Sequence, residues 1–449
     1  MLHDITFKNF KSYQEASLPL ASLTMLIGAN ASGKSNAIEG LRLLSWLAQG
    51  NRLSSIQSAV QESNRLMRGR IQDLGYHSSP RFSFSCSGMS QTTQQRINID
   101  LEIKKEGSLR IVGEVLDCFM SESFLSLYQV TQSAAGMGTD LLVEYNNFIL
   151  DETLPTIICC DQYAIFTQLD SPAKFASYHK TSQEVILSAT AHFRTWLSNI
   201  LFLDLVPAKM RDYSFKNEKQ LQGDGKNLSS VLFDLWGGNK KVKLTLDEKN
   251  NRKSILNFIG SLPEQDIDTI DFLSGPRGEV MVQIQETFGR EMRKYDASLL
   301  SDGTLRVMAI AAAMLSCPEG GMVVIEEIDN GVHPSRAALL MEQIALLAAR
   351  RSLRVLLSSH NPALLDALPD SAIPHVVFCY RDPENGSSRL IQLQNIPDYP
   401  ELIAQGSVGR LMTSGILERF VKHYSGTEDK KQKALDWLAR LQKETTNLI

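Results

Sequence analysis

Hydrophobic and polar residues change their spacing several times along the chain, and each change predicts a different kind of element. Near the start, apolar residues alternate with polar ones through 2–13 and again through 16–20, which predicts a β-hairpin. A continuous apolar run at 23–27 follows and is typical of a buried strand. From 36 to 48 the apolar side chains recur at helical spacing, so a helix is expected soon after that strand.

The middle of the chain divides into two parts with different periods. Between 81 and 150, short alternating runs are separated by Ser, Gly and Gln, which predicts an antiparallel sheet. Between 151 and 275 the period becomes helical, so this part is expected to be an inserted helical arm. Two helix faces are expected there, one with Phe193, Trp196, Leu197, Ile200 and Leu201, and one with Leu228, Val231, Leu232 and Leu235.

The last third of the chain returns to buried strands that alternate with helices. Helices are predicted at 307–315 and about 408–424, buried-strand runs at 322–329 and 353–360, strands at 375–380 and 389–393, and an amphipathic tail with Ala434, Leu438 and Leu441 in register. We therefore expect an α/β fold with a mixed, largely parallel core sheet. Its four regions are an N-terminal lobe with the antiparallel β-subdomain at 1–150, the helical arm at 151–275, a C-terminal lobe at 276–425 and the tail at 426–449.

The segment between the predicted strand and the first helix carries a phosphate-binding pattern. It matches G-x-x-x-x-G-K-[ST], and such a loop is expected to surround nucleotide phosphates with its backbone N–H groups. Lys34 can reach the β- and γ-phosphates, and the Ser35 hydroxyl can bind Mg²⁺. The alternative is an ordinary glycine turn before a helix; the order strand, loop, helix favours ATP and Mg²⁺ as cofactors. The residues expected to bind the nucleotide are Gly28, Ala29, Asn30, Ala31, Ser32, Gly33, Lys34, Ser35 and Asn36.

A second cluster of candidate residues comes late in the chain. Ser301 and Gly303 open an apolar helix and can present donors to an anion. Glu326 and Glu327 end a buried strand, as in a Walker B strand, where the first carboxylate serves Mg²⁺ and the second polarises the attacking water. His360 ends a further strand, where it is either a γ-phosphate sensor or a structural histidine.

Composition and charge narrow the class of protein. The 449 residues are 43% hydrophobic and 21% charged, with a formal net charge of -4, which does not favour nucleic acid as a general partner. Locally, 205–253 holds 11 Lys or Arg against 6 Asp or Glu, which suits nucleic acid, an acidic partner or a solvated face. The six cysteines lack zinc-like spacing, and neither a leader nor a membrane span is indicated. We expect a cytoplasmic protein with no membrane partner.

Several other basic and polar residues have two readings. Lys11, in the predicted hairpin turn, either lies over the nucleotide or is solvated. Arg65, Arg68 and Arg70 either face phosphate or form a solvated face.

The order of the motifs resembles the ATP-binding-cassette (ABC) ATPases, and within them the RecF-, SMC- and OLD-like branch. The segments that carry the resemblance are the P-loop, Leu-Ser-Asp-Gly-Thr-Leu-Arg at 300–306, Glu-Glu-Ile-Asp-Asn-Gly-Val-His-Pro at 326–334 and Ser-His-Asn-Pro-Ala-Leu-Leu-Asp at 359–366. The chain looks like the stand-alone bacterial ATPases called AAA-21 or OLD-like, some of which belong to antiphage defence systems. This resemblance implies an ABC-type ATPase head.

The resemblance also implies roles for individual residues. Glu327 becomes the catalytic base, His360 the switch histidine, and Ser301 with Gly303 the signature that closes on ATP held by a second subunit. A dimer or higher oligomer with shared ATP sites is therefore expected. Glu326 stands where the family has Asp, and Ile328 where it has Pro, so slow hydrolysis or altered metal geometry is expected. Gln72 is the candidate for the glutamine that links the metal to the arm.

The resemblance leaves the biological role open between several classes. OLD-type nucleases carry a later metal-binding domain with Asp-x-Asp, and no Asp-x-Asp follows His360 here. A nuclease is therefore expected to be a separate polypeptide that this ATPase regulates in antiphage defence. The alternatives are a DNA-repair ATPase that clamps DNA directly, a transporter subunit and a non-hydrolysing scaffold. A transporter subunit is disfavoured because the P-loop and the signature of such subunits lie much closer together in sequence than they do in this chain.

Overall fold

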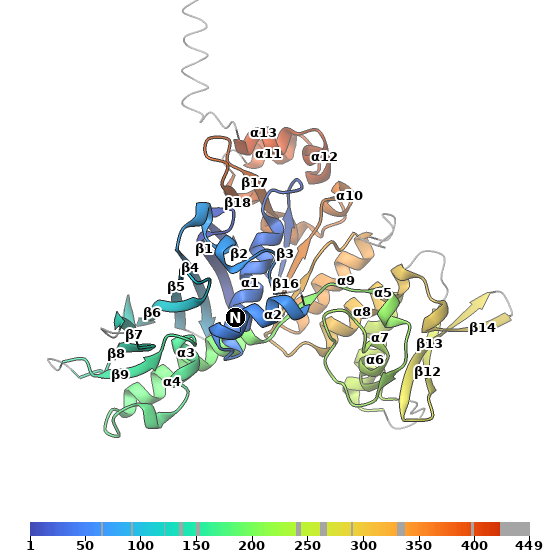
Figure 1. Cartoon of the computed structure of the whole chain (residues 1–449). Coiled ribbons are helices and arrows are strands. Elements are labelled where there is room, and N and C mark those ends of the chain that lie inside the picture. Colours follow the sequence, from blue (N-terminus) through green and yellow to red (C-terminus); the bar gives the residue numbers. More distant parts are fainter. Residues whose placement is uncertain are drawn as a thin grey trace, which may run out of the picture.

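In the computed structural model the chain forms a central sheet with a second sheet on each side, and these two outer sheets are called arms (Figure 1). The structure describes residues 1–63, 66–90, 93–120, 122–133, 138–149, 153–238, 244–260, 267–288, 291–329, 337–396 and 399–422. The predicted tail at 426–449 and the stretch 330–334 of the second motif lie outside these residues. No helix in the described part of the chain is both long and apolar enough to span a membrane.

One arm is an eight-stranded antiparallel sheet that begins with the N-terminal hairpin. In spatial order its strands are β2 Tyr13–Pro19, β1 Leu2–Phe10, β4 Arg81–Ser90, β5 Thr93–Ile103, β6 Leu109–Met120, β7 Ser123–Ser133, β8 Asp140–Tyr145 and β9 Thr156–Cys160. The predicted hairpin is confirmed, since Phe10 pairs with Tyr13 across its turn. The predicted antiparallel sheet between 81 and 150 is confirmed as well, and β9 extends it.

The central sheet has six strands and positions the candidate site. Its strands, in spatial order, are β10 Ile200–Leu203, β15 Met322–Ile325, β16 Arg354–Ser358, β3 Leu23–Ile27, β17 Val377–Arg381 and β18 Ser388–Gln392. The first five are parallel and β18 is antiparallel, as expected for a mixed, largely parallel sheet. Because β15, β16 and β3 are neighbours, the segments that follow their carboxyl ends meet at one edge, where α/β proteins bind ligands.

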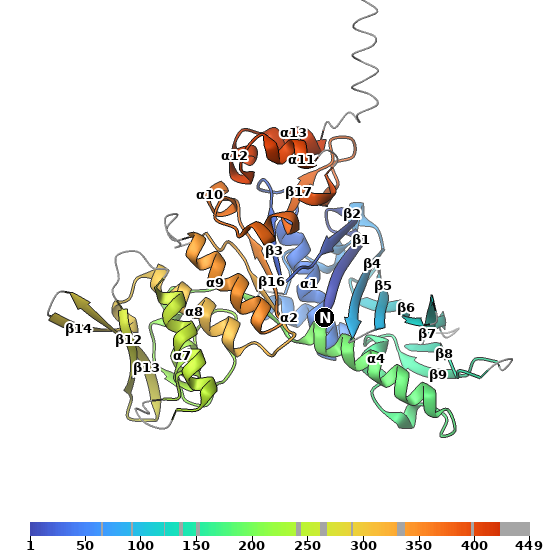
Figure 2. The same cartoon turned by 180° about the vertical axis from the view of Figure 1, so that it is seen from behind.

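A smaller antiparallel sheet forms the second arm, on the opposite side of the molecule (Figures 1 and 2). It contains β11 Ser214–Phe215, β12 Ile267–Ser274, β13 Glu279–Phe288 and β14 Glu291–Asp296. Helices α6 and α7 pack beside it. The range 151–275 therefore supplies strands to all three sheets as well as helices.

Helices cover the sheets and cap one end of the molecule. They are α1 Lys34–Ala48, α2 Ile56–Ser63, α3 Ile165–Gln168, α4 Lys180–Ser198, α5 Pro207–Met210, α6 Leu228–Trp236, α7 Leu246–Ile259, α8 Asp302–Ser316, α9 Ala337–Arg350, α10 Pro362–Leu365, α11 Tyr399–Ala404, α12 Val408–Thr413 and α13 Ile416–Lys422. Helices α11 to α13 lie beyond β17 and β18 (Figure 1).

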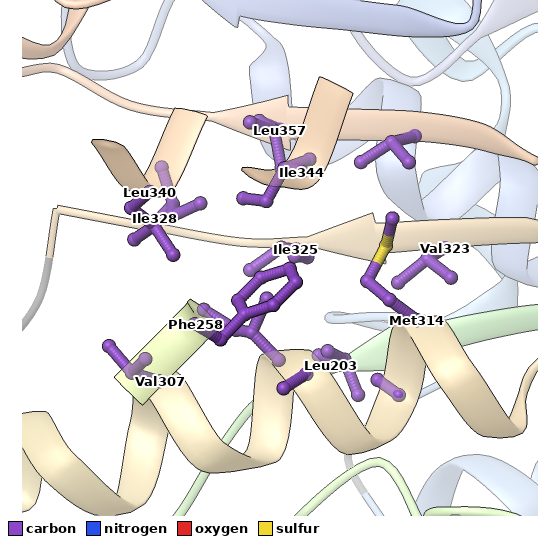
Figure 3. Packing of buried hydrophobic residues seen from close by; sticks show 14 of the residues in the cluster. Leu203, Phe258, Val307, Met314, Val323, Ile325, Ile328, Leu340, Ile344 and Leu357 are labelled. Atoms are coloured by element: carbon purple, nitrogen blue, oxygen red, sulfur yellow. The ribbon is translucent and has the colours of Figure 1, made fainter. Parts of the chain in front are cut away.

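Alternate residues of the central strands enter two separate hydrophobic cores. In β15, Met322 and Val324 belong to the core shared with α1 and the large sheet, whereas Val323 and Ile325 face the other core. Figure 3 shows this second core, to which helices α7, α8 and α9 contribute on one face of β15. A parallel sheet buried on both faces needs such continuously apolar strands. Each fully buried Val, Leu or Ile contributes about 1.5–3 kcal/mol.

Two helix predictions differ from the structure. Ile200 and Leu201 were expected on the helix face that begins at Phe193, but α4 ends at Ser198 and both residues lie in β10. A four-residue apolar run has no period of its own, and its pairing with β15 makes it a strand. The helix expected at 408–424 is divided in two, because Gly415 adopts a left-handed φ of 69° between α12 and α13. The predicted face of α6 is buried as expected.

Candidate functional site

The loop between β3 and α1 contains two glycines that the surrounding structure requires. Gly28 has a φ of 148°, and a Cβ there would lie 2.1 Å from the carbonyl oxygen of Cys379. Gly33 has a φ of 123°, and a Cβ there would lie 2.4 Å from the hydroxyl oxygen of Ser388. Strands β17 and β18 thus pack directly behind the loop, and only glycine permits that approach.

Buried hydrogen bonds fix the same loop from behind. The carbonyl oxygen of Ser32 accepts from the Ser388 hydroxyl at 2.5 Å and from the Cys379 thiol at 3.3 Å. The next carbonyl, that of Gly33, accepts from the Tyr13 hydroxyl at 2.9 Å. These donors come from three strands that are distant in sequence, so the loop conformation is set before any ligand binds.

Lys34 begins α1 and directs its ammonium group back over the loop. Its Nζ donates to the carbonyl oxygens of Gly28 at 2.6 Å and Ala29 at 3.0 Å. Burial lowers the pKa of Lys34, and nearby acidic groups that include Glu327 and Asp329 oppose that shift. The ammonium therefore lies in a partly buried site close to carboxylates.

A cleft of about 450 Å³ brings most of the predicted residues together. It is lined by Asn30, Ala31, Gly33, Lys34, Ser35 and Asn36 of the loop, by Glu326, Glu327, Ser358, Ser359 and His360, and by Lys11, Ser12, Glu39, Arg68 and Arg381. Ala29 and Ser32 line a different cavity, of about 210 Å³, on the side of α13. A third cavity, of about 370 Å³, shares Ser35, Glu326 and Glu327 with the cleft.

The two adjacent carboxylates have different surroundings. Glu326 accepts a hydrogen bond from Nη2 of Arg42 on α1 at 2.8 Å. Glu327 has a left-handed φ of 50°, which is uncommon for a residue with a side chain and costs about 1–3 kcal/mol. Its backbone N–H donates to the Ser358 hydroxyl at 3.2 Å, which helps to hold this conformation.

Ile328 stands where the resemblance leads one to expect proline, and the structure gives a reason. Its backbone N–H donates to the carbonyl oxygen of Ser358 at 3.1 Å, a bond that proline cannot make. Its side chain is buried in the core between β15 and the helices of Figure 3. Isoleucine thus extends the contact between β15 and β16 beyond the strands themselves.

His360 follows β16 and approaches a buried carboxylate. Its Nε2 lies 3.6 Å from Oδ2 of Asp329, whose other oxygen accepts from the Ser359 hydroxyl at 2.8 Å. The Asp329 side chain is 8% exposed, whereas that of His360 is 54% exposed. The histidine can therefore reach a ligand in the cleft while Asp329 orients its ring.

A comparison with protein families identifies the chain. The model of the AAA_21 family, described as "AAA domain, putative AbiEii toxin, Type IV TA system", matches residues 23–132 and 168–366, more than half of the chain. The chain belongs to the AAA_21 family. It is therefore an AAA-type ATPase by family, with the α/β fold expected from its sequence.

Solved structures with similarity to this AAA_21 chain include heads of SMC proteins. The SmcHead bound to the C-winged helix domain of ScpA has 12% identity, covers 87% of this chain and 96% of its own, and has a TM-score of 0.44. The SMC head domain from Thermotoga maritima has 12% identity, covers 87% of this chain and 98% of its own, and has a TM-score of 0.40. The Smc head domain bound to the C-terminal domain of ScpA, derived from Pyrococcus furiosus, has 12% identity, covers 94% of this chain and 99% of its own, and has a TM-score of 0.40.

The candidate signature of the AAA_21 chain lies elsewhere. Ser301 caps α8 and accepts from the N–H of Thr304 at 3.1 Å. Arg211 holds this segment by donating to the carbonyl oxygen of Leu300 at 3.0 Å and to Asp302 at 2.6 Å. Among the described residues that line the P-loop cleft, neither Ser301 nor Gly303 is present.

Gln72, the candidate link between metal and arm, also lies away from the cleft. It belongs to a 3₁₀ turn at Ile71–Leu74 rather than to the end of a strand. Its side chain is exposed and lies against Gly107 in the turn between β5 and β6. The described residues that line the cleft and its neighbouring cavity do not include it.

Sequence reasoning named Lys11 and Arg68 as candidates beside the P-loop of the AAA_21 chain but missed their partner, Glu39. Glu39, buried on α1, pairs with Lys11 and accepts from Arg68 at 2.8 Å. Of the two interpretations of Lys11, the solvated one is wrong, because its side chain is 10% exposed and lines the cleft. Arg68 reaches a carboxylate as well as solvent. The available signal was Glu39 and Arg42, two charged residues three positions apart among the apolar residues in the middle of α1. Arg65 lies outside the described residues.

Proposed function

We propose that this chain binds ATP with Mg²⁺ and hydrolyses it to ADP and phosphate. The observation that supports this most is the meeting of Lys34, Ser35, Glu327 and His360 in one cleft at the carboxyl ends of neighbouring strands. Strands β17 and β18 fix the loop from behind, where its glycines leave no room for a side chain. A loop held in this way at the N-terminus of a helix presents backbone N–H groups to a phosphate. The Ser35 hydroxyl and the Glu326 carboxylate are the hard oxygen ligands that Mg²⁺ prefers.

Each residue then has one task in the reaction. The Lys34 ammonium neutralises phosphate charge, and when bound Mg²⁺ supplies further neutralisation of that charge. The Glu327 carboxylate accepts a proton from the attacking water. His360, oriented by Asp329, donates a hydrogen bond toward the terminal phosphate. General-base catalysis of this kind contributes about 10²–10⁴-fold to the rate.

We further propose that two copies of the chain share each ATP site. The cleft of one chain lacks Ser301 and Gly303 among its described lining residues, and these residues are solvent-accessible at the start of α8. A second copy that presents its α8 N-terminus to the cleft would add hydrogen-bond donors and a favourable helix dipole to the phosphates. ATP would then act as a switch that closes and opens the dimer.

Glu327→Gln tests the assignment of the base. The substitution keeps the size of the side chain but removes its ability to accept a proton. We expect steady-state phosphate release to fall about 10²–10⁴-fold while the equilibrium affinity for ATP stays within about threefold, so ATP-bound dimers accumulate. Turnover that persists at the parent rate, or equal loss of ATP affinity in Glu327→Gln and Glu326→Gln, would contradict these roles.

The biological proposal is that this ATPase regulates a separately encoded effector, a nuclease, in bacterial defence against phage. The family description, which refers to a toxin–antitoxin system, supports a defence role. Such regulation requires that ATP change the affinity for the partner and that the partner change the affinity for ATP by the same factor. Co-elution with and without ATP, together with phage plating of the parent and of Glu327→Gln, measures both parts.

The alternative is an ATPase of the DNA-repair type that clamps DNA directly. The bias toward Lys and Arg between 205 and 253 motivates it, yet several of these side chains have partners within the chain. Lys209 pairs with Asp224, and the Arg252 guanidinium lies 4.8 Å from the Trp236 ring. Duplex binding whose affinity falls steeply with salt, with no protein partner and no effect on plating, would favour the DNA-repair role.

A further inference from the structure

The pairing of Arg42 with Glu326 gives the candidate metal ligand a second partner. Arg42 lies on α1, two turns beyond Lys34, and its Nη2 donates to Oε1 of Glu326 at 2.8 Å. We propose that Arg42 is a positioning residue that holds the Glu326 carboxylate in a latched state, which a divalent cation must open in order to bind that carboxylate. This inference rests on the proposed ATP and Mg²⁺ site.

Arg42 is itself held in place, so the latch has a defined geometry. Its guanidinium carbon lies 4.7 Å from the centre of the Phe202 ring, a cation–π contact. Phe202 belongs to β10 and pairs in register with Val324 of β15, the strand that carries Glu326 at its end. The Arg42 side chain is 13% exposed and that of Glu326 26% exposed, so solvent only partly screens the pair.

The replacement of aspartate by glutamate makes this contact understandable. Glutamate carries its carboxylate one methylene farther from the backbone, and here that carboxylate meets Arg42. An aspartate at 326 would end about 1.5 Å short of this position, too far for the observed hydrogen bond. The substitution therefore couples the metal ligand to α1, the helix that begins in the P-loop.

Other charged residues lie close to this pair, so a test must separate the contact between Arg42 and Glu326 from the general effect of charge. The cavity that contains both side chains is also lined by Glu39, Asp204, Arg306 and Glu327. Glu39 is already paired with Lys11 and Arg68. Arg68 and Arg306 are further cations that line the cavity. Because Arg68 is paired with Glu39, Arg306 of α8 is the residue that reports the effect of positive charge alone.

Removal of Arg42 is expected to strengthen cation binding for two reasons. Removal of Arg42 ends the competition for the Glu326 oxygen, and it also removes a positive charge that repels the cation. Loss of the contact that positions Glu326 acts the other way, but the carboxylate remains attached directly after the buried strand β15. We therefore expect Arg42→Met to tighten binding of the cation.

The test measures equilibrium Mn²⁺ binding in the presence of ATP by the electron paramagnetic resonance of free Mn²⁺. All proteins carry Glu327→Gln, so turnover does not interfere. Arg42→Met is expected to tighten Mn²⁺ binding about fivefold to tenfold, and less than about twofold when Glu326→Asp is also present. A tenfold change corresponds to about 1.4 kcal/mol. The difference between the changes measured with and without Glu326→Asp gives the coupling between the two positions.

Two further variants make the measurement specific. Arg306→Met is the matched control, since it removes a cation from the same cavity, and it is expected to change Mn²⁺ affinity less than about twofold. Arg42→Lys keeps the charge and the alkyl stem beside Phe202 but loses the forked donor geometry, and it should tighten binding about twofold. Arg42→Lys also serves if thermal unfolding shows that Arg42→Met does not fold.

The outcomes separate this inference from the function on which it rests. Unchanged or weaker Mn²⁺ binding in Arg42→Met, or an equal change with and without Glu326→Asp, would overturn the latch. If the Glu327→Gln protein that keeps Arg42 and Glu326 binds no Mn²⁺ in the presence of ATP, the proposed function itself is wrong and the latch is overturned with it.

Discussion

The P-loop and the signature segment differ in how firmly the same chain holds them. Behind the P-loop, Tyr13, Cys379 and Ser388 donate buried hydrogen bonds to consecutive loop carbonyls. The segment that begins α8 is solvent-accessible, and the neighbouring Leu299 is 68% exposed. A single chain thus holds the loop that we propose to bind phosphate, and it leaves the signature segment at the start of α8 exposed. We expect this difference to reflect a site in which the P-loop, the first half, binds ATP, and the signature segment, the second half, acts only on ATP bound to another chain of a dimer.

The largest expected effect comes from Lys34→Ala, in the firmly held half. The substitution removes the only P-loop cation, so we expect ATP affinity to fall at least about a hundredfold, or 2.7 kcal/mol, and hydrolysis to be lost with it. The fold should survive, because the Lys34 ammonium bonds only to carbonyl oxygens of its own loop among the described contacts.

Equilibrium titration with ATP measures this effect, and Lys8→Ala provides the matched control. Lys8 is an exposed lysine of β1, and its loss should leave affinity unchanged. An affinity of Lys34→Ala within about threefold of the parent, less than 0.7 kcal/mol, would contradict the nucleotide site.

Ser301→Arg is expected to separate the two halves, since it places a bulky cation in the open one. ATP binding to the P-loop should stay within about threefold while hydrolysis stops. A mixture with Lys34→Ala protein should recover at most one competent site per dimer, because each chain then supplies one intact half. Phosphate release by monomers at the full rate, independent of protein concentration, would show that the site is not shared.

The smallest effects compare two serines, one in each half. Ser388→Ala removes a buried hydroxyl that bonds to Ser32 and Ser12, so we expect about 1–3 kcal/mol less stability and several-fold weaker ATP binding. Ser301→Ala removes a helix cap and should cost about 1 kcal/mol without a change in ATP affinity. Thermal unfolding and ATP titration of both variants measure the contrast. Equal changes of ATP affinity would argue against any difference between the halves.

Local patterns allowed the P-loop and the strands around it to be predicted. The strand, the glycines and the helix at 23–48 are contiguous, and each depends on interactions between near neighbours in sequence. The buried strands were recognised because a parallel sheet covered on both faces requires continuous apolar runs. The same reasoning failed at Ile200 and Leu201, where a short apolar run is compatible with either a helix or a strand.

What the sequence by itself determined is the nucleotide loop, the fold class and the family to which its motifs point. The tertiary structure decided which distant side chains meet at that loop. Glu39 with Lys11, Arg42 with Glu326, and His360 with Asp329 are brought together by strand order and helix packing. The physical reason is that such pairs depend on contacts between residues far apart in sequence, which no local period encodes.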